Sequence, residues 1–344
     1  MSLRPEQIDD LVNTTQQHLI KRGAKINYTT DLVDFVALRE IFDKHKQVFN
    51  GGLDWRFDIM TDHNHSARMT GLFENDGATI VDSMVHGQVG PRFIDAHYVY
   101  DVREPEFQRG GLEIVNLIKT RYEAMKLSYL ELLERALWAA PADATDTRTI
   151  YGIPFWITKS TTMGFNGVDP AGFATGRAGI SSNTVSRWKN WTAGYDNVSK
   201  EDLIRTMRKA VRATNFRSPL SMNEPTFKSG NGIYTTDSVI GTMEEILEAQ
   251  NMNLGNDLAS KDNKTMFKST PVTYVPLLDV DATNPIYLID WKYMGLGMMA
   301  GWSERVTKPQ QVPNKHTVRA VYLDSGVNMV CTDLRRQAVI VKKS

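Results

Sequence analysis

The sequence has little cysteine, no long hydrophobic run and no excess of charge of either sign. Cys331 is the single cysteine among 344 residues, which excludes a disulfide framework and any zinc site built from several cysteines. Such a chain is expected to fold in a reducing cytoplasm. Its 40 basic residues (Lys and Arg) balance its 40 acidic residues, so overall charge does not draw it to nucleic acid or to a membrane.

Membrane and export signals are also missing. The longest apolar window, residues 294–302, is too short and too rich in glycine to be a transmembrane helix. The N-terminal residues MSLRPEQIDDLVNTTQQ lack the apolar region of a signal peptide, so none is expected. The composition, 41% hydrophobic and 23% charged, is that of an ordinary globular protein. The length suggests about two domains.

Motifs that carry catalysis are scarce. The sequence contains no G-x-S-x-G nucleophile elbow and no P-loop. Cys331 lies in an alternating apolar stretch without a nearby histidine, so it is expected to pack in the core. The glycine-rich residues 164–179 lack a dinucleotide-binding pattern and are predicted to form a surface loop. We therefore predict that the protein is not an enzyme and has no catalytic, cofactor-binding or metal-binding residues.

One alternative of another class stays open. In the stretch DHNH, His63 and His65 lie one residue apart and follow an acid, a set that can bind zinc or nickel. His86 and His97 do not have the spacing of a closed zinc site. A polar hairpin tip is the favoured interpretation of this stretch, and a metal-dependent hydrolase that uses His63 and His65 is the alternative.

The strongest pattern that is present predicts a long amphipathic helix. No proline interrupts residues 106–138, and apolar residues recur at steps of three and four from Ile114 to Ala136. About 33 residues at 1.5 Å each give roughly 50 Å of helix, which is more than a compact domain of ordinary size requires. Tyr129 and Leu133 lie on the apolar stripe and are expected to be buried.

The segments on either side of this helix have a different character. Residues 31–49 read as a helix that ends before two glycines, and residues 53–103 read as extended chain with glycine-rich turns, which predicts a long hairpin. Residues 324–326, Asp-Ser-Gly, have hairpin-turn chemistry. We predict an α+β fold with a mostly antiparallel sheet near the C-terminus, built from strands at residues 271–278, 285–291, 317–323, 327–333 and 337–341.

In this order the parts resemble the major capsid proteins of tailed bacteriophages, which have the Hong Kong 97-type fold. The stretches that carry the resemblance are EPEFQRGGLEIVNLIKTRYEAM, TIYGIPFWIT, GTMEEILEAQNMNLGNDLASKD, STPVTYVPLLD, NPIYLIDW and VNMVCTDLRRQAVIV. The pairing of IYGIPFWITKSTTMGFNG with SRWKNW is similar to one subgroup of these proteins. The resemblance extends over nearly the whole chain.

The resemblance implies a division of the chain. TIYGIPFWIT, residues 149–158, would follow the spine helix and lead into the body, with its apolar side chains packed under the helix. The implied parts are an N-terminal arm at 1–52, an E-loop hairpin at 53–103, a peripheral (P) domain at 104–195 with the spine helix at 106–138, an axial (A) domain at approximately 196–314, and a return to the P domain at 315–344.

The resemblance also implies a function. Copies of the chain would assemble into hexamers and pentamers of an icosahedral head that encloses double-stranded DNA without sequence-specific binding. The expected partners are other copies of the chain, a portal, a scaffold and decoration proteins, with no membrane. The protein would be found in the virion after assembly in the host bacterial cytoplasm. The closest alternative is the shell of an encapsulin-like nanocompartment.

Two features of charge concern the contacts between copies. The type member of the fold joins its shell covalently through an E-loop lysine, but here no lysine occurs between Lys46 and Lys119, so a non-covalent shell is expected.

Residues 53–103 hold eight acids and four bases, whereas residues 200–217 hold six bases and two acids. We hypothesise that the hairpin docks electrostatically on the basic segment of a neighbour. Nucleic-acid binding by that segment is less favoured, because the whole chain is neutral.

Overall fold

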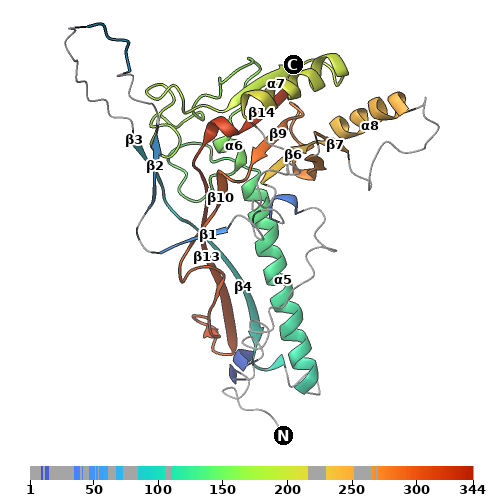
Figure 1. Cartoon of the computed structure of the whole chain (residues 1–344). Helices are drawn as coiled ribbons and strands as arrows, with labels where there is room; N and C mark the ends of the chain where they lie inside the picture. The colour runs from blue at the N-terminus through green and yellow to red at the C-terminus, as the bar shows by residue number, and fades with distance from the viewer. Residues whose placement is uncertain are drawn as a thin grey trace.

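The computed structural model shows an elongated molecule in which a long helix lies beside two long strands, with a second body at one end (Figure 1). No helix among the described residues is long and apolar enough to cross a bilayer. The structure describes residues 9–10, 12–14, 35–38, 41, 46–50, 52, 54–60, 67–72, 84–104, 111–215, 230–251, 265–268 and 270–343.

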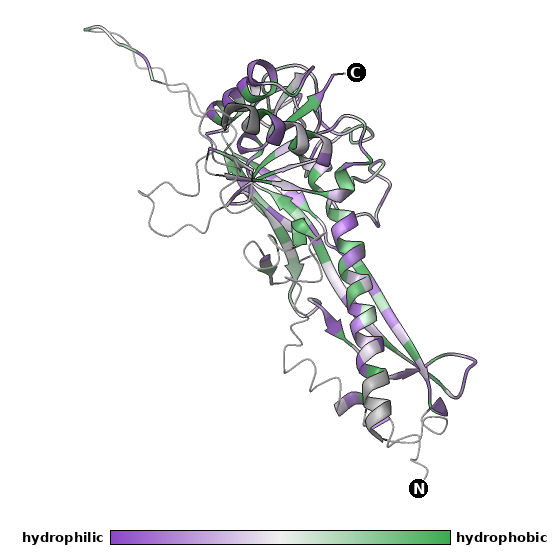
Figure 2. Cartoon of the chain, turned by 90° about the vertical axis from the view of Figure 1, so that its right-hand side faces the viewer, coloured by the Kyte–Doolittle hydropathy of each residue, from purple (hydrophilic) through white to green (hydrophobic). Residues whose placement is uncertain are grey.

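The long helix α5 spans Gly111–Leu137. It packs along strand β4 (Arg92–Asp101), and its apolar stripe enters the main hydrophobic core. Tyr129 and Leu133 are buried, as the spacing predicts. Hydrophobic and hydrophilic residues alternate along α5 and the strands beside it (Figure 2). The predicted helix of residues 106–138 ends within one residue of the observed end, and residues 105–110 lie outside the described residues.

In the described part of the chain, the first sheet has six strands. Strand β13 is its centre: it pairs antiparallel with β4 over ten residues, and also with β10, β11 and β12, while β1 pairs with β10 in parallel. The core therefore lies between this sheet and α5. The strands besides β4 are β1 (Lys46–Phe49), β10 (Met294–Met299), β11 (Arg305–Val306), β12 (Gln310–Gln311) and β13 (Val318–Cys331).

Two local predictions are wrong in this sheet. Residues 324–326 do not turn, because β13 runs through them as one strand. Strand β4 pairs with all three and holds them extended, since tertiary pairing overrides the turn preference of the residues. The predicted helix at residues 31–49 also does not reach its end, because Lys46–Phe49 pair with β10 as strand β1.

The second sheet has the strand order β5-β14-β9-β6-β8-β7 among the described residues. Helices α7 (Arg205–Ala213) and α8 (Asp237–Asn251) supply side chains to the core that this sheet forms. A π-helical turn, η1 (Lys200–Ile204), leads into α7. The strands are β5 (Trp191–Tyr195), β6 (Asn231–Thr235), β7 (Met266–Phe267), β8 (Thr270–Tyr274), β9 (Ile286–Asp290) and β14 (Ala338–Lys342).

Short helical turns connect these layers. Ser199 caps η1, because its Oγ accepts a hydrogen bond from the backbone N–H of Asp202. The remaining turns are α6 (Ile153–Trp156), η3 (Pro276–Leu278) and η4 (Leu334–Arg336).

The third element is a two-stranded hairpin of β2 (Trp55–Met60) and β3 (Met84–Val89), which projects from the body (Figure 1). Strand β4, which follows it, belongs to the first sheet. Sheet pairing also joins segments from different predicted domains, since β9 pairs with β14 and β10 pairs with β13. The domain limits given above stay a prediction.

Candidate functional site

The hairpin is fixed to the body at its root. Trp55 is buried and stacks on Phe49 of β1, with ring centroids 4.7 Å apart. The indole lies over Gly297 of β10, where a Cβ atom would come within 2.5 Å of the ring. Only glycine therefore admits Trp55 at this point, and the anchored tryptophan sets the direction in which the hairpin leaves the sheet.

The two faces of the hairpin differ. The register places Phe57 opposite Gly87 and Ile59 opposite Val85, which makes one face apolar. On the other face Asp58 lies opposite His86, whose Nδ1 is 2.6 Å from the Asp58 Oδ1. Phe57, Ile59 and Val85 are half-buried and pack against the main core of the same chain, so the apolar face holds the hairpin to the body and the polar face is exposed.

Further along the hairpin, residues 67–72 expose their side chains. Met69 is fully exposed and Leu72 is 91% exposed, and Arg68 beside them is exposed too. Both views place this segment far from the body of the chain (Figures 1 and 2). Large apolar side chains in such a position are typical of a contact with another molecule.

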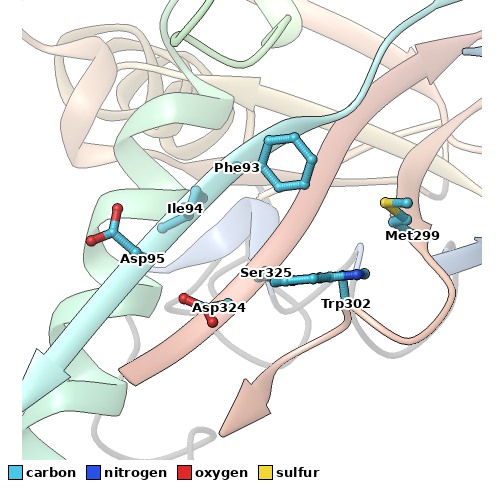
Figure 3. Close-up of a pocket in the computed structure, with 7 residues that line it drawn as sticks. All are labelled: Phe93, Ile94, Asp95, Met299, Trp302, Asp324 and Ser325. Atoms are coloured by element: carbon cyan, nitrogen blue, oxygen red, sulfur yellow. The ribbon is translucent and has the colours of Figure 1, made fainter. Parts of the chain in front are cut away.

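A groove of about 420 Å³ lies on the outward face of the first sheet (Figure 3). Its apolar wall comes from Phe93 of β4, Met299 of β10 and Trp302 of the following loop. Phe93 is 64% exposed and Trp302 is 38% exposed. Gly326 of β13 lies opposite Phe93 in the register, and a Cβ there would lie 3.2 Å from Phe93 and 3.3 Å from Met299. A side chain at this position would therefore crowd two of the residues that form the apolar wall.

Two carboxylates border the groove. Asp95 of β4 and Asp324 of β13 lie opposite each other in the register and therefore on the same face as Phe93. Like charges in directly opposed positions destabilise a strand pair. Neither carboxylate forms an ion pair within the described part of the chain. Arg305 lies opposite Asp324 on β11, but its guanidinium stacks 5.0 Å from the centroid of the Trp302 ring.

Helix α7 carries the basic segment that the sequence singles out. Its buried face, Thr206, Met207, Ala210 and Val211, packs on the second sheet. Arg205, Arg208 and Arg212 are exposed on the other face. None of the large apolar side chains that the chain exposes lies on α7, so this helix offers positive charge without apolar surface.

The apolar stretch of residues 149–158 packs where the resemblance implies. Ile153, Phe155 and Trp156 are buried in the main core. Gly152 lies against the end of α5, where a Cβ would fall 2.1 Å from the carbonyl oxygen of Ala139. Trp156 also donates from its indole Nε1 to the carbonyl of Met329 on β13. The stretch thus joins the helix to the sheet.

The predicted surface loop at residues 164–179 is wrong where it contains Arg177. This side chain is completely buried. Its guanidinium donates to the carbonyl oxygens of Trp156 (2.7 Å) and Gly167 (2.8 Å) and to the Oδ1 of Asn190 (3.2 Å). Burial lowers the pKa of Arg177 to about 10. Sequence patterns give no signal for such a residue, because most of its partners are backbone carbonyls.

A second buried charge joins the N-terminal segment to the spine. Glu134 of α5 is buried, and its carboxylate accepts hydrogen bonds from the backbone N–H groups of Ala37 (3.0 Å) and Leu38 (2.8 Å). The indole of Trp138 donates to the same carboxylate at 2.8 Å. Burial raises the pKa of Glu134, while these donors oppose the rise. The amphipathic pattern did not mark Glu134, since it predicts only apolar burial.

The candidates for chemistry do not come together in the described residues. Cys331 is buried in β13, as predicted, and burial raises the pKa of its thiol well above the usual range. His86 pairs with Asp58, and the His97 ring tilts against Tyr322 with centroids 5.7 Å apart. His63 and His65 lie outside the described residues. Within the described ranges, no three metal-ligating side chains group together.

Comparison with known proteins concerns the fold. No protein-family model matches the sequence, and no curated protein matches it. The cyanophage A-1(L) capsid protein matches in structure with a TM-score of 0.61 and 16% identity, over 89% of this chain and 92% of that chain. The capsid of a native GTA particle matches with a TM-score of 0.58 and 11% identity, over 90% of this chain and 91% of that chain. The capsid of an empty GTA particle matches with a TM-score of 0.55 and 11% identity, over 89% of this chain and 96% of that chain.

These likenesses extend over nearly the whole length of both partners, so they describe the complete fold. The chain has the fold of capsid proteins. More narrowly, it has the Hong Kong 97-type fold of phage capsids that its sequence resembles, and the α+β prediction is confirmed.

Proposed function

We propose that the protein is the major capsid protein of a tailed bacteriophage. The observation that carries the proposal is the likeness to capsid proteins over 89% of the chain and 92% of its partner. It is joined by surfaces that one copy cannot cover: the exposed side chains of residues 67–72 and the groove at Phe93. Apolar surface left open on a projecting element fits a subunit that is completed by its neighbours.

In this proposal the copies form hexamers and pentamers of an icosahedral head. The hairpin lies on a neighbour's P domain, the A domains surround the capsomer axis, and the N-terminal arm reaches across. Each contact is weak, but every subunit makes many, so the shell is stable. The head encloses double-stranded DNA without sequence-specific contacts and works with a portal, a scaffold and decoration proteins. It assembles in the cytoplasm of the host bacterium, and the protein performs no catalysis.

Expression of the chain in bacteria, alone and with candidate scaffold proteins, followed by electron microscopy, tests this proposal. The expected result is closed particles with pentameric and hexameric capsomers. Absence of any particle under all these conditions would contradict it. Particles that hold a protein cargo, and no nucleic acid after nuclease treatment, would favour the encapsulin-like alternative. Stoichiometric zinc in the purified chain would favour the metal-dependent hydrolase.

A variant that lacks the end of the hairpin but keeps its root tests the role of the hairpin in assembly. Residues 61–83 are replaced by a short turn that joins β2 to β3, so that the root at Trp55 is kept. Because the side chains of the described residues 67–72 are exposed, the variant is expected to keep the unfolding midpoint of the full chain and to form no closed particles. Normal particles from this variant would contradict the intersubunit role of the hairpin.

A further inference from the structure

We propose that the groove formed by Phe93, Met299 and Trp302 receives residues 67–72 of a second copy. The inference rests on the proposed function and names the receptor for the end of the hairpin. It replaces α7 as the docking surface for this segment. The two surfaces are complementary in apolar character and in charge.

The apolar match comes first. Met69 and Leu72 are among the most exposed large apolar side chains of the described chain, and the groove offers two aromatic side chains and a methionine. Transfer of a methionine or leucine side chain from water to such a surface is favourable, because it removes apolar area from water. A thioether beside an aromatic ring adds a favourable contact.

The charge match follows. Residues 67–72 contain one cation, Arg68, and no acid. Asp95 and Asp324 sit at the rim of the groove, directly opposite each other, and their repulsion is relieved by a cation between them. Arg305 is the nearby cation of the same chain, and its guanidinium is stacked on Trp302. A guanidinium has the fork geometry that serves two carboxylates at once.

The occupant comes from another copy. Trp55 fixes the root of the hairpin over Gly297, next to the groove, and the hairpin leads away from there. Two views at right angles both place residues 67–72 far from the body (Figures 1 and 2). The segment and the groove of one chain therefore do not meet, whereas a neighbour's segment can approach the open face.

Helix α7 is the rival receptor. Its exposed face presents Arg205, Arg208 and Arg212 and no large apolar side chain. Arg68 would be repelled there, and Met69 and Leu72 would stay in contact with water. The acidic residues of the hairpin would suit α7, but residues 67–72 do not include them.

Disulfide trapping in assembled shells tests the inference. Cys331 is buried, so engineered cysteines are the accessible ones. The chain with Leu72→Cys and Phe93→Cys is assembled, oxidised and run on a non-reducing gel. The expected result is a ladder of multimers that reductant removes. Leu72→Cys with Arg208→Cys probes α7 in the same way, and Leu72→Cys with Val280→Cys, at an exposed position elsewhere, is the matched control.

A ladder from the α7 cysteine pair or from the control pair, with none from the groove pair, would overturn the inference. The proposed function would still stand in that case, because the variants would have assembled into normal particles. If the unaltered chain forms no particles at all, the proposed function fails and the inference fails with it. A ladder from the groove pair alone establishes the receptor.

Charge reversal gives an independent readout. Arg68→Glu alone, and Asp95→Lys with Asp324→Lys, are each expected to reduce the yield of closed particles at least tenfold. The combined triple variant is expected to recover most of that yield. The unfolding midpoint of the unassembled chain serves as the control, and it should change little, because Arg68 and Asp95 are exposed. Equal loss in the triple variant and the separate variants would contradict the pairing.

Discussion

At the scale of single residues, Glu134 is the position where burial and charge conflict. Two of its three donors, the N–H groups of Ala37 and Leu38, hold the N-terminal segment on the spine, yet burial disfavours its ionised form. A raised pKa means that the folded chain binds this proton more tightly than the unfolded chain does. The contribution of Glu134 to stability is therefore greatest below about pH 4, the ordinary range of a glutamate, and falls as the pH rises through the folded-state pKa.

The direction of the pKa shift of Glu134 predicts how stability depends on pH. Glutamine does not titrate, so the free energy of unfolding of the wild type minus that of Glu134→Gln should decrease as the pH is raised from about 4 toward neutrality. Urea denaturation of the unassembled chain at several pH values measures it. Glu131→Gln, at a partly exposed position three residues earlier on α5 where the carboxylate pairs with Arg135, is the control. A difference that stays constant or rises with pH would show that Glu134 is not the titrating group.

At the scale of elements, the spine helix depends on its buried stripe. Leu133 is completely buried, whereas Leu132 beside it is 52% exposed. Leu133→Ala is expected to lower the free energy of unfolding by about 2–5 kcal/mol, because it removes apolar contacts and leaves a cavity. Leu132→Ala is the matched control and should change it by less than about 0.5 kcal/mol. Equal effects in chemical denaturation of the two variants would mean that the stripe is misassigned.

The elements also show how far sequence patterns extend. The period of α5 was predictable, because burial along one face leaves a repeat at steps of three and four. The continuity of β13 through residues 324–326 was not, since it comes from pairing with β4, more than 200 residues away in sequence. For the same reason the groove was hidden: Gly326 reads as a turn residue, and only the register reveals that it lies opposite Phe93 of the groove wall.

Long-range geometry explains the other differences too. Gly152 reads as part of a turn, but it is required because the end of α5 leaves no room for a Cβ atom. Arg177 and Glu134 are buried charges, and hydrophobic periodicity predicts neither of them. The segment at residues 67–72 could be predicted only as part of an extended hairpin, since exposure of Met69 and Leu72 depends on where the hairpin points.

At the scale of the whole molecule, the question is whether copies are joined by bonds or by contacts alone. A cross-link of the kind that the type member of this fold forms needs an amine on the hairpin, and the chain has no lysine between Lys46 and Lys119. The hairpin instead offers Met69, Leu72 and Arg68. Such groups bind by burial and by ion pairing, and both are reversible.

Purified shells that are boiled in denaturant under reducing conditions should therefore run as one band near 38.9 kDa. A ladder that survives reduction would show covalent bonds between copies and contradict the expectation.

The dependence of shell stability on salt distinguishes the two docking surfaces. Contacts on α7 between exposed charges are screened over about 8 Å at physiological ionic strength, so they should weaken strongly as salt rises. Salt does not screen the apolar contacts in the groove. Shells held by the groove should therefore lose, as salt rises, only the part of their stability that comes from the ion pairs of Arg68 with Asp95 and Asp324.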